Sequence, residues 1–317
     1  MSKMLSLNEK AKAVIEPLIE KPESFQVAVS KLESGATLID CGIEAKGSVD
    51  AGVLFSKACL GGIGEVLVNS FPACEGSTSA VSVAVEMAVE ALMASQYAGW
   101  AIKKGKYFAM GSGPARALYA GEKLFEEIGH KEKSDVAVLC LEAREYPTGE
   151  VVEYILGKTG VSAENLYILI APTASIVGSI QISARIVETA VHKMHEIGFD
   201  LDSISGGAGA APIAPVAKDD LSAIGRTNDC VLYGGKANIS VDCDDKFIRE
   251  RIESIPSSSS KDYGRTFIEL FKEYGDFYKI DPLLFSPAMI TVHNLRSRSA
   301  FSAGSLNMDI LRKSFAS

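Results

Sequence analysis

The chain has 317 residues, of which 47% are apolar and 23% are charged. This composition is typical of a folded globular protein and excludes disordered, collagen-like and fibrous chains. At about 150 residues per domain, the length predicts two domains. The 40 acidic residues outnumber the 32 lysines and arginines, which gives a net charge of −8. Because an acidic surface repels nucleic-acid phosphates and anionic lipid headgroups, we expect no nucleic-acid partner.

Membrane, secreted and metal-binding classes are also disfavoured. The most apolar stretch, residues 79–102, is interrupted by Glu86 and Glu90, so it is not a membrane span. Residues 1–10 contain neither an apolar signal-peptide region nor a cleavage site, and we expect a cytoplasmic protein. The six cysteines form no C-x-x-C pair, which argues against a disulfide framework and a structural zinc site.

In the N-terminal half, helical and strand patterns alternate. Apolar residues at spacings of three and four predict a helix within residues 1–20 that ends before Pro22, with Ser6 or Asn8 as its cap. Continuous apolar runs at 136–141 and 166–171 are typical of strands buried on both faces. The other predicted elements are a hairpin over 25–41, a helix over 51–60, a strand over 65–70, a helix over 79–95 and a short helix over 115–120.

The C-terminal half predicts further helices and strands without an internal repeat. The expected elements are helices starting at 150 and spanning 177–197 and 247–254, strands over 231–233 and 237–241, and a polar loop over 256–260. Strands that alternate with helices predict a mixed α/β fold in layers. An approximate division of the two domains is 1–165 and 166–317.

The segment Gly111-Ser112-Gly113-Pro114-Ala115-Arg116 is a candidate anion-binding loop. Glycines allow the backbone to approach a ligand, and free N–H groups at the helix that starts after Pro114 attract anions. The segment is neither a Walker A loop nor a G-x-G-x-x-G fingerprint. A tight structural turn explains the same residues.

The predicted helix over 177–197 carries the most informative polar face. Five polar residues share one arc at helical spacing: Gln181, Arg185, Glu188, His192 and His195. An arginine three residues before a glutamate keeps that carboxylate charged, and such a group can act as a general base on water. A solvent-exposed ion pair is the alternative. The two histidines lack a third metal ligand, so we expect no metal site.

The position of this helix favours a functional role. It follows a predicted buried strand and the turn Pro172-Thr173-Ala174-Ser175, and sites in open α/β folds gather beyond the carboxyl ends of strands. Two more segments offer flexible backbone or hydrogen-bonding groups, although ordinary turns are the alternative: Ser205 to Pro212, and Arg226-Thr227-Asn228-Asp229. Together with Arg116 and Arg185, they suggest one pocket for a large polar ligand that carries negative charge.

Several long strings of residues resemble the methenyltetrahydromethanopterin cyclohydrolases. The strings are 107–117 (YFAMGSGPARA), 171–179 (APTASIVGS) and 185–190 (RIVETA), with shorter matches at 40–42, 98–100, 227–229, 262–264 and 276–282. They cover the chain in order from about residue 5 to 310. The chain departs from the family pattern over 70–94 and at 209–212, where two alanines replace a polar residue and a cysteine of some members.

The resemblance implies reversible hydrolysis of N5,N10-methenyltetrahydromethanopterin to the N5-formyl compound in C1 metabolism. It implies two α/β domains with the pterin site in the cleft between them, no redox cofactor or metal, and a homo-oligomer, often a trimer. Glu188 matches the family's catalytic glutamate, which would position and deprotonate water, and Arg185 would orient it and tune its pKa. The substrate-binding candidates are Gly111, Ser112, Gly113, Arg116, Thr173, Ser175, Gln181, Asn228 and Asp229.

Two other functions compete with this interpretation. A phosphate-transferring enzyme built on the 111–116 loop predicts nucleotide binding and a magnesium requirement. A non-catalytic pterin-binding protein predicts binding without loss of the methenyl chromophore.

Overall fold

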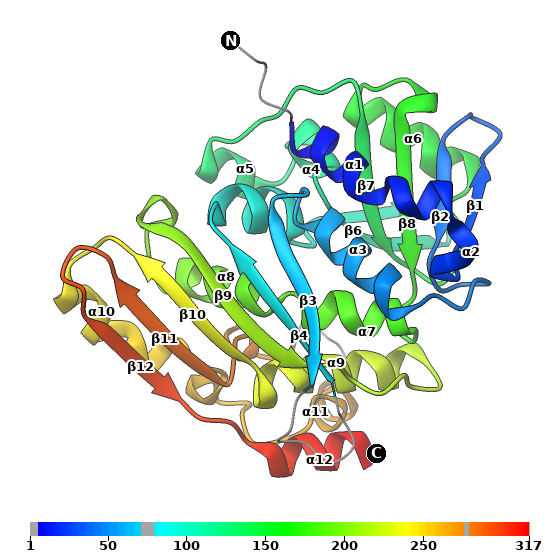
Figure 1. Cartoon of the computed structure of the whole chain (residues 1–317). Coiled ribbons are helices and arrows are strands. Elements are labelled where there is room, and N and C mark those ends of the chain that lie inside the picture. Colours follow the sequence, from blue (N-terminus) through cyan, green and yellow to red (C-terminus); the bar gives the residue numbers. More distant parts are fainter. Residues whose placement is uncertain (1–5, 71–78, 276–278, 317) are drawn as a thin grey trace. The chain divides into compact units, whose positions relative to one another are not determined.

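The computed structural model describes the chain at residues 6–70, 79–275 and 279–316 (Figure 1). The chain forms two compact units, each made of two segments. The first unit comprises Met1–Gly64 and Val89–Gln181, and the second comprises Glu65–Ala88 and Ile182–Ser317. The expected α/β class, with mixed sheets and helices, is confirmed. Cys74 and the string at 276–278 lie outside the described residues.

The first unit is built on a six-stranded sheet with the order β1-β2-β8-β7-β6-β5. The strands are β1 (Ala28–Lys31), β2 (Thr37–Asp40), β5 (Trp100–Lys104), β6 (Tyr107–Ser112), β7 (Ala137–Glu142) and β8 (Leu166–Ala171). β8 runs parallel to β2 and to β7, whereas the other neighbours are antiparallel. The carboxyl ends of β2, β8 and β7 therefore meet at one edge of the sheet.

Helices cover both faces of this sheet. The elements are α1 (Leu7–Glu20), α2 (Pro22–Phe25), α3 (Val49–Cys59), the π-helix η1 (Val89–Gln96), α4 (Ala115–Tyr119), α5 (Lys123–Ile128), α6 (Gly149–Thr159), η2 (Ala163–Asn165) and α7 (Ile176–Ser183). Successive residues of the central strands belong to different apolar clusters, because side chains alternate between faces. Leu139 packs in the cluster of α6, and Val138 in that of α1 and α3. The buried strands and the α1 helix, which begins with a Ser6 capping box, are confirmed.

The second unit contains another six-stranded sheet with the order β12-β11-β10-β9-β4-β3 (Figure 1). The strands are β3 (Gly64–Ser70), β4 (Ser79–Val85), β9 (Ile204–Pro212), β10 (Lys236–Val241), β11 (Met289–Asn294) and β12 (Ala300–Gly304). Its helices are α8 (Ile186–Glu196), η3 (Leu201–Ser203), α9 (Asp220–Gly234), α10 (Asp245–Arg251), η4 (Ile252–Ser254), η5 (Ser257–Ser259), α11 (Phe267–Tyr274), η7 (Pro282–Leu284) and α12 (Met308–Ala316).

Three expected elements are wrong in this unit. The glycine-rich stretch at 205–212 is part of strand β9, where the absence of side chains lets α8 approach. A Cβ on Gly209 would lie 3.0 Å from Ile186, and one on Gly207 would lie 3.2 Å from Val187. Residues 79–85 form β4 instead of a helix, because this Ala/Val/Ser run pairs with β9 on one side and with β3 on the other. Residues 231–233 belong to α9, whose N-terminus is capped by Asp219.

The continuous helix expected over 177–197 is also wrong. α7 ends at Ser183 and α8 begins at Ile186, with Arg185 in the N-cap position of α8. The described cysteines are free thiols. Among the described residues, no helix combines the length and apolar character that a membrane crossing requires.

Candidate active site

The break between α7 and α8 brings Arg185 and Glu188 together at the start of α8. Nη1 of Arg185 donates to Oε2 of Glu188 over 2.9 Å. The two side chains are only 12% and 5% exposed, so the alternative of a solvated surface pair is wrong. Glu188 lies in the first turn of α8, where the positive end of the helix dipole favours a carboxylate. Glu188 is therefore a nearly buried carboxylate that Arg185 holds in position, and such a group can act as a general base.

The expected polar arc is formed only in part, with Glu188, His192 and His195 together on α8. Gln181 lies on α7, in a different helix from Glu188. Nε2 of His192 lies 3.8 Å from Oε1 of Glu196 on the same helix. No group of three or more His, Cys, Asp or Glu residues that could hold a metal ion occurs within the described part of the chain.

A second cluster gathers around Glu142, the last residue of β7. The hydroxyl of Thr173 donates to Oε1 of Glu142 over 2.6 Å, and Nε2 of Gln181 donates to Oε2 over 3.0 Å. Two predicted binding residues thus converge on a carboxylate that the sequence analysis missed. Both donors are neutral and buried, while Glu142 is half-buried. Each carboxylate oxygen accepts one of these bonds and has a second lone pair for another donor.

Ser175 and Asp40 organise the loops beside this cluster. The hydroxyl of Ser175 donates to Pro172 O and accepts from Gly178 N, which fixes the start of α7. Asp40, at the end of β2, accepts four backbone N–H bonds and the hydroxyl of Tyr146. Burial acts to raise the pKa of Asp40, but these hydrogen bonds outweigh it and lower the pKa. We infer that Asp40 holds its loop in place.

The segment 111–116 has the geometry of a tight structural turn. Gly111, Ser112, Gly113 and Arg116 are all buried. Gly113 has a φ of +95°, which favours glycine, and its N–H donates to Ser95 O over 2.8 Å.

The guanidinium of Arg116 is engaged with protein groups. It donates twice to the carboxylate of Glu122, at 2.8 and 2.6 Å, and to the carbonyls of Met93 and Ser95. Its centre also lies 5.2 Å from the ring centroid of Phe125. The side chain is 0% exposed, so Arg116 has a structural role, and the expectation that it binds an anion is wrong.

Asn228 and Asp229 lie inside α9 of the second unit. Nδ2 of Asn228 donates to Ile224 O over 2.8 Å. Asp229 is fully buried, and its Oδ1 accepts from the N–H of Phe267, the first residue of α11, over 2.9 Å. Burial raises the pKa of Asp229 to about 7, against the hydrogen bonds from Ser314 and Phe267 that lower it. This geometry ties α11 to α9 and does not point to a ligand.

Comparison with known proteins identifies the family to which these features belong. Residues 6–315 match the family model described as Cyclohydrolase (MCH). The chain belongs to the cyclohydrolase (MCH) family.

Three relatives of this cyclohydrolase family member bear the name methenyltetrahydromethanopterin cyclohydrolase. The protein from Methanocaldococcus jannaschii is 47% identical over 98% of both chains. That from Methanococcoides burtonii is 44% identical, also over 98% of both. That from Methylobacillus flagellatus is 42% identical over 98% of this chain and 95% of its own. The resemblance seen in the sequence is thereby confirmed.

Glu142 was not among the site residues predicted from the sequence. The signal that could have revealed it is its position: it is the single acidic residue that ends the apolar run of a strand otherwise buried on both faces. In a parallel pair such a residue lies at the edge where ligands bind.

Proposed function

We propose that the chain catalyses the reversible hydrolysis of N5,N10-methenyltetrahydromethanopterin to N5-formyltetrahydromethanopterin. The names of its relatives support this substrate. The observation that carries the proposal is the nearly buried Arg185–Glu188 pair. The methenyl carbon is bonded to two nitrogens that share a positive charge, so it is already electrophilic. Such a substrate needs an oriented water and a base more than it needs further activation.

In the proposed mechanism, Glu188 accepts a proton from water as the water oxygen bonds to the methenyl carbon. The resulting tetrahedral adduct is neutral, and Glu188 is then protonated. Glu188 returns this proton to N10 as the bond between carbon and N10 breaks, and it then accepts the hydroxyl proton of the adduct, which leaves the formyl group on N5. Release of that proton to solvent accounts for the one proton that the overall reaction produces. Arg185 would hold the carboxylate in position through these proton transfers. Because the substrate is a cation, the negative charge of Glu188 also favours its binding.

We further propose that Glu142 recognises the pterin ring. The 2-amino-4-oxo ring presents two adjacent donors, the N3–H and the 2-amino group, which match the two oxygens of a carboxylate. Thr173 and Gln181 hold those oxygens with one neutral hydrogen bond each. A bidentate contact to a charged acceptor contributes orientation as well as affinity.

The expected surroundings of the reaction are part of the proposal. We propose that the enzyme uses no metal or redox cofactor, acts in cytoplasmic C1 metabolism, and forms a homo-oligomer.

Self-association is supported by a row of uncharged residues that lie opposite one another on successive strands of the second sheet: Ala84, Ala208, Asn238, Thr291 and Ser302. All five are exposed or half-buried in the single chain. Light scattering on the purified protein would give the number of copies, and a monomer would contradict self-association.

The decisive experiment follows the absorbance of methenyltetrahydromethanopterin when purified protein is added. We expect the methenyl chromophore to be lost catalytically, with and without EDTA. Binding without loss of the chromophore would favour a non-catalytic pterin-binding protein. Nucleotide binding with a magnesium requirement would favour phosphate transfer.

A further inference from the structure

A pocket of about 440 Å³ lies in the second unit. Its walls come from α8, from the end of α10 with η4, and from η5 and η7. The lining residues are Lys193, Ile197, Glu250, Arg251, Ser254, Ser259 and Leu283. Two cations, two hydroxyls and two apolar side chains thus face one space, together with a single carboxylate.

Lys193 is the central group of the pocket. It is only 2% exposed, and its Nζ donates to Oγ of Ser259 over 3.3 Å and to the carbonyl of Leu283. Two of the three N–H donors of Nζ therefore have neutral acceptors. Burial lowers the pKa of Lys193 to about 8, against the opposing charge of Asp281. A buried ammonium with neutral partners is strongly stabilised by an anion that reaches it.

The acidic group at the rim is already compensated. Glu250 lies 3.6 Å from Nη1 of Arg251 and 3.9 Å from Nζ of Lys246. Arg251 is itself positioned, because its guanidinium lies 3.8 Å from the ring centroid of Phe247. Lys193, Arg251 and Lys246 together carry three positive charges against the two negative charges of Glu250 and Asp281, so one positive charge remains for an incoming anion.

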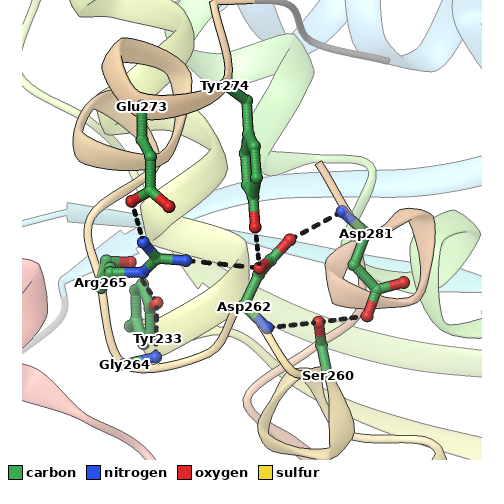
Figure 2. A network of polar contacts seen from close by, with 8 residues as sticks. All are labelled: Tyr233, Ser260, Asp262, Gly264, Arg265, Glu273, Tyr274 and Asp281. Carbon is green, nitrogen blue, oxygen red and sulfur yellow. Dashed lines mark hydrogen bonds and ion pairs between the residues drawn. The ribbon is translucent and has the colours of Figure 1, made fainter. Parts of the chain in front are cut away.

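A network of polar contacts joins the segments next to two wall residues of the pocket, Ser259 and Leu283; Figure 2 shows the network itself. The hydroxyl of Ser260 donates to Oδ2 of Asp281 over 2.6 Å. The carboxylate of buried Asp262 accepts from the backbone N–H of Asp281 and from the hydroxyl of Tyr274, both over 2.8 Å. Arg265 donates to Asp262 over 3.3 Å and also pairs with Glu273. The network joins the turn that carries Ser259 to the turn that carries Leu283, so both walls are ordered before any ligand binds.

We propose that this pocket binds a phosphate monoester. Its phosphate group would contact Lys193 and Arg251, and its organic part would pack on Ile197 and Leu283. Lys193 follows Glu188 by five residues on α8, which corresponds to a rotation of about 140° around the helix. The pocket therefore lies on a different side of α8 from the Arg185–Glu188 pair and does not depend on the proposed reaction.

Titration calorimetry on the full chain at pH 7 tests this site with glycerol 3-phosphate, inorganic phosphate and glycerol. We expect saturable binding of glycerol 3-phosphate, weaker binding of inorganic phosphate, and none of glycerol. Lys193→Met and Arg251→Gln should each weaken the binding of glycerol 3-phosphate by about tenfold or more, because each removes a charge-assisted contact. Lys123→Met is the matched control, since the Lys123 side chain is 86% exposed and lies in the first unit.

Three results would overturn the proposal. One is the lack of saturable binding of glycerol 3-phosphate to the wild-type chain, and another is unchanged affinity in both pocket variants. The third is equal affinity for inorganic phosphate and glycerol 3-phosphate, which would assign the site to the free anion. If Lys193→Met does not fold, Arg251→Gln decides, because the Arg251 side chain is 33% exposed and its loss leaves the core intact.

Discussion

Replacing Glu188 with glutamine is the most direct test of the proposed general base. The amide keeps the size of the side chain and an oxygen that can accept from Nη1 of Arg185, which is 2.9 Å away in the wild type. Only the negative charge and the ability to take a proton are lost. Exchanging a charged for a neutral acceptor costs about 1 kcal/mol of folding free energy. Losing a general base lowers kcat about 10²–10⁴-fold, or about 3–5 kcal/mol of transition-state stabilisation.

The predicted rate loss is thus much larger than the predicted loss of stability, so the two effects can be separated. Stopped-flow absorbance of the methenyl chromophore gives kcat, and thermal melting gives stability. Glu196→Gln is the matched control, because it removes the same charge from α8 at a side chain that is 52% exposed, and its kcat should stay at the wild-type value. A folded Glu188→Gln protein that keeps more than about a tenth of the wild-type kcat would refute the general-base role.

Three further predictions concern other buried or half-buried charges. Glu142→Gln should raise KM for the methenyl substrate about tenfold and change kcat less than about threefold. The control Glu145→Gln, at an exposed side chain, should change neither constant. If Glu142→Gln and the wild type have equal KM values, Glu142 does not recognise the pterin. Because the pKa of Asp229 is raised to about 7 from 3.8, its contribution to stability is complete below pH 4 and is lost as pH rises to 7. At pH 8, the free energy of unfolding of Asp229→Asn in urea should therefore exceed that of the wild type by at most about 4 kcal/mol. This gain should be absent at pH 3.5. A variant that is less stable than the wild type at pH 8 would contradict the reasoning. Arg116→Met should lower the unfolding free energy by about 3 kcal/mol with KM unchanged, and a raised KM in the folded variant would return Arg116 to the substrate site.

The sequence predicted most elements whose pattern is local. Strands β7 and β8 were recognisable as unbroken apolar runs, and α1 by its spacing and Ser6 cap. β9 was missed because its glycines and alanines have low strand propensity on their own. Their small size suits the helix α8 that packs on them, and this is tertiary information. The same applies to β4, an Ala/Val/Ser run that becomes a strand through pairing with β9.

The candidate site was predicted in part for a similar reason. Arg185 and Glu188 are close in sequence, so their spacing alone predicted the pair that the structure contains. Arg116 looked like an anion ligand because two of its acceptors, the carbonyls of Met93 and Ser95, come from a distant helix, and its third partner, Glu122, lies beyond the motif. Glu142 was missed because Thr173 and Gln181 are joined to it only through the parallel pairing of β7 and β8.

The crossing of the chain between the two units affects how the protein is synthesised. The first unit needs residues up to Gln181, and the second unit takes Glu65–Ala88 from inside the first. Strand β4 is made early, yet its partner β9 emerges from the ribosome much later, since Ala80 pairs with Pro212. Neither unit can be completed from one continuous half of the gene, so a nascent chain keeps the edge of β4 that pairs with β9 without a partner for much of its synthesis. We expect slow folding and a need for protection from aggregation at this stage, because pairing between distant segments is slow and unpaired strands associate.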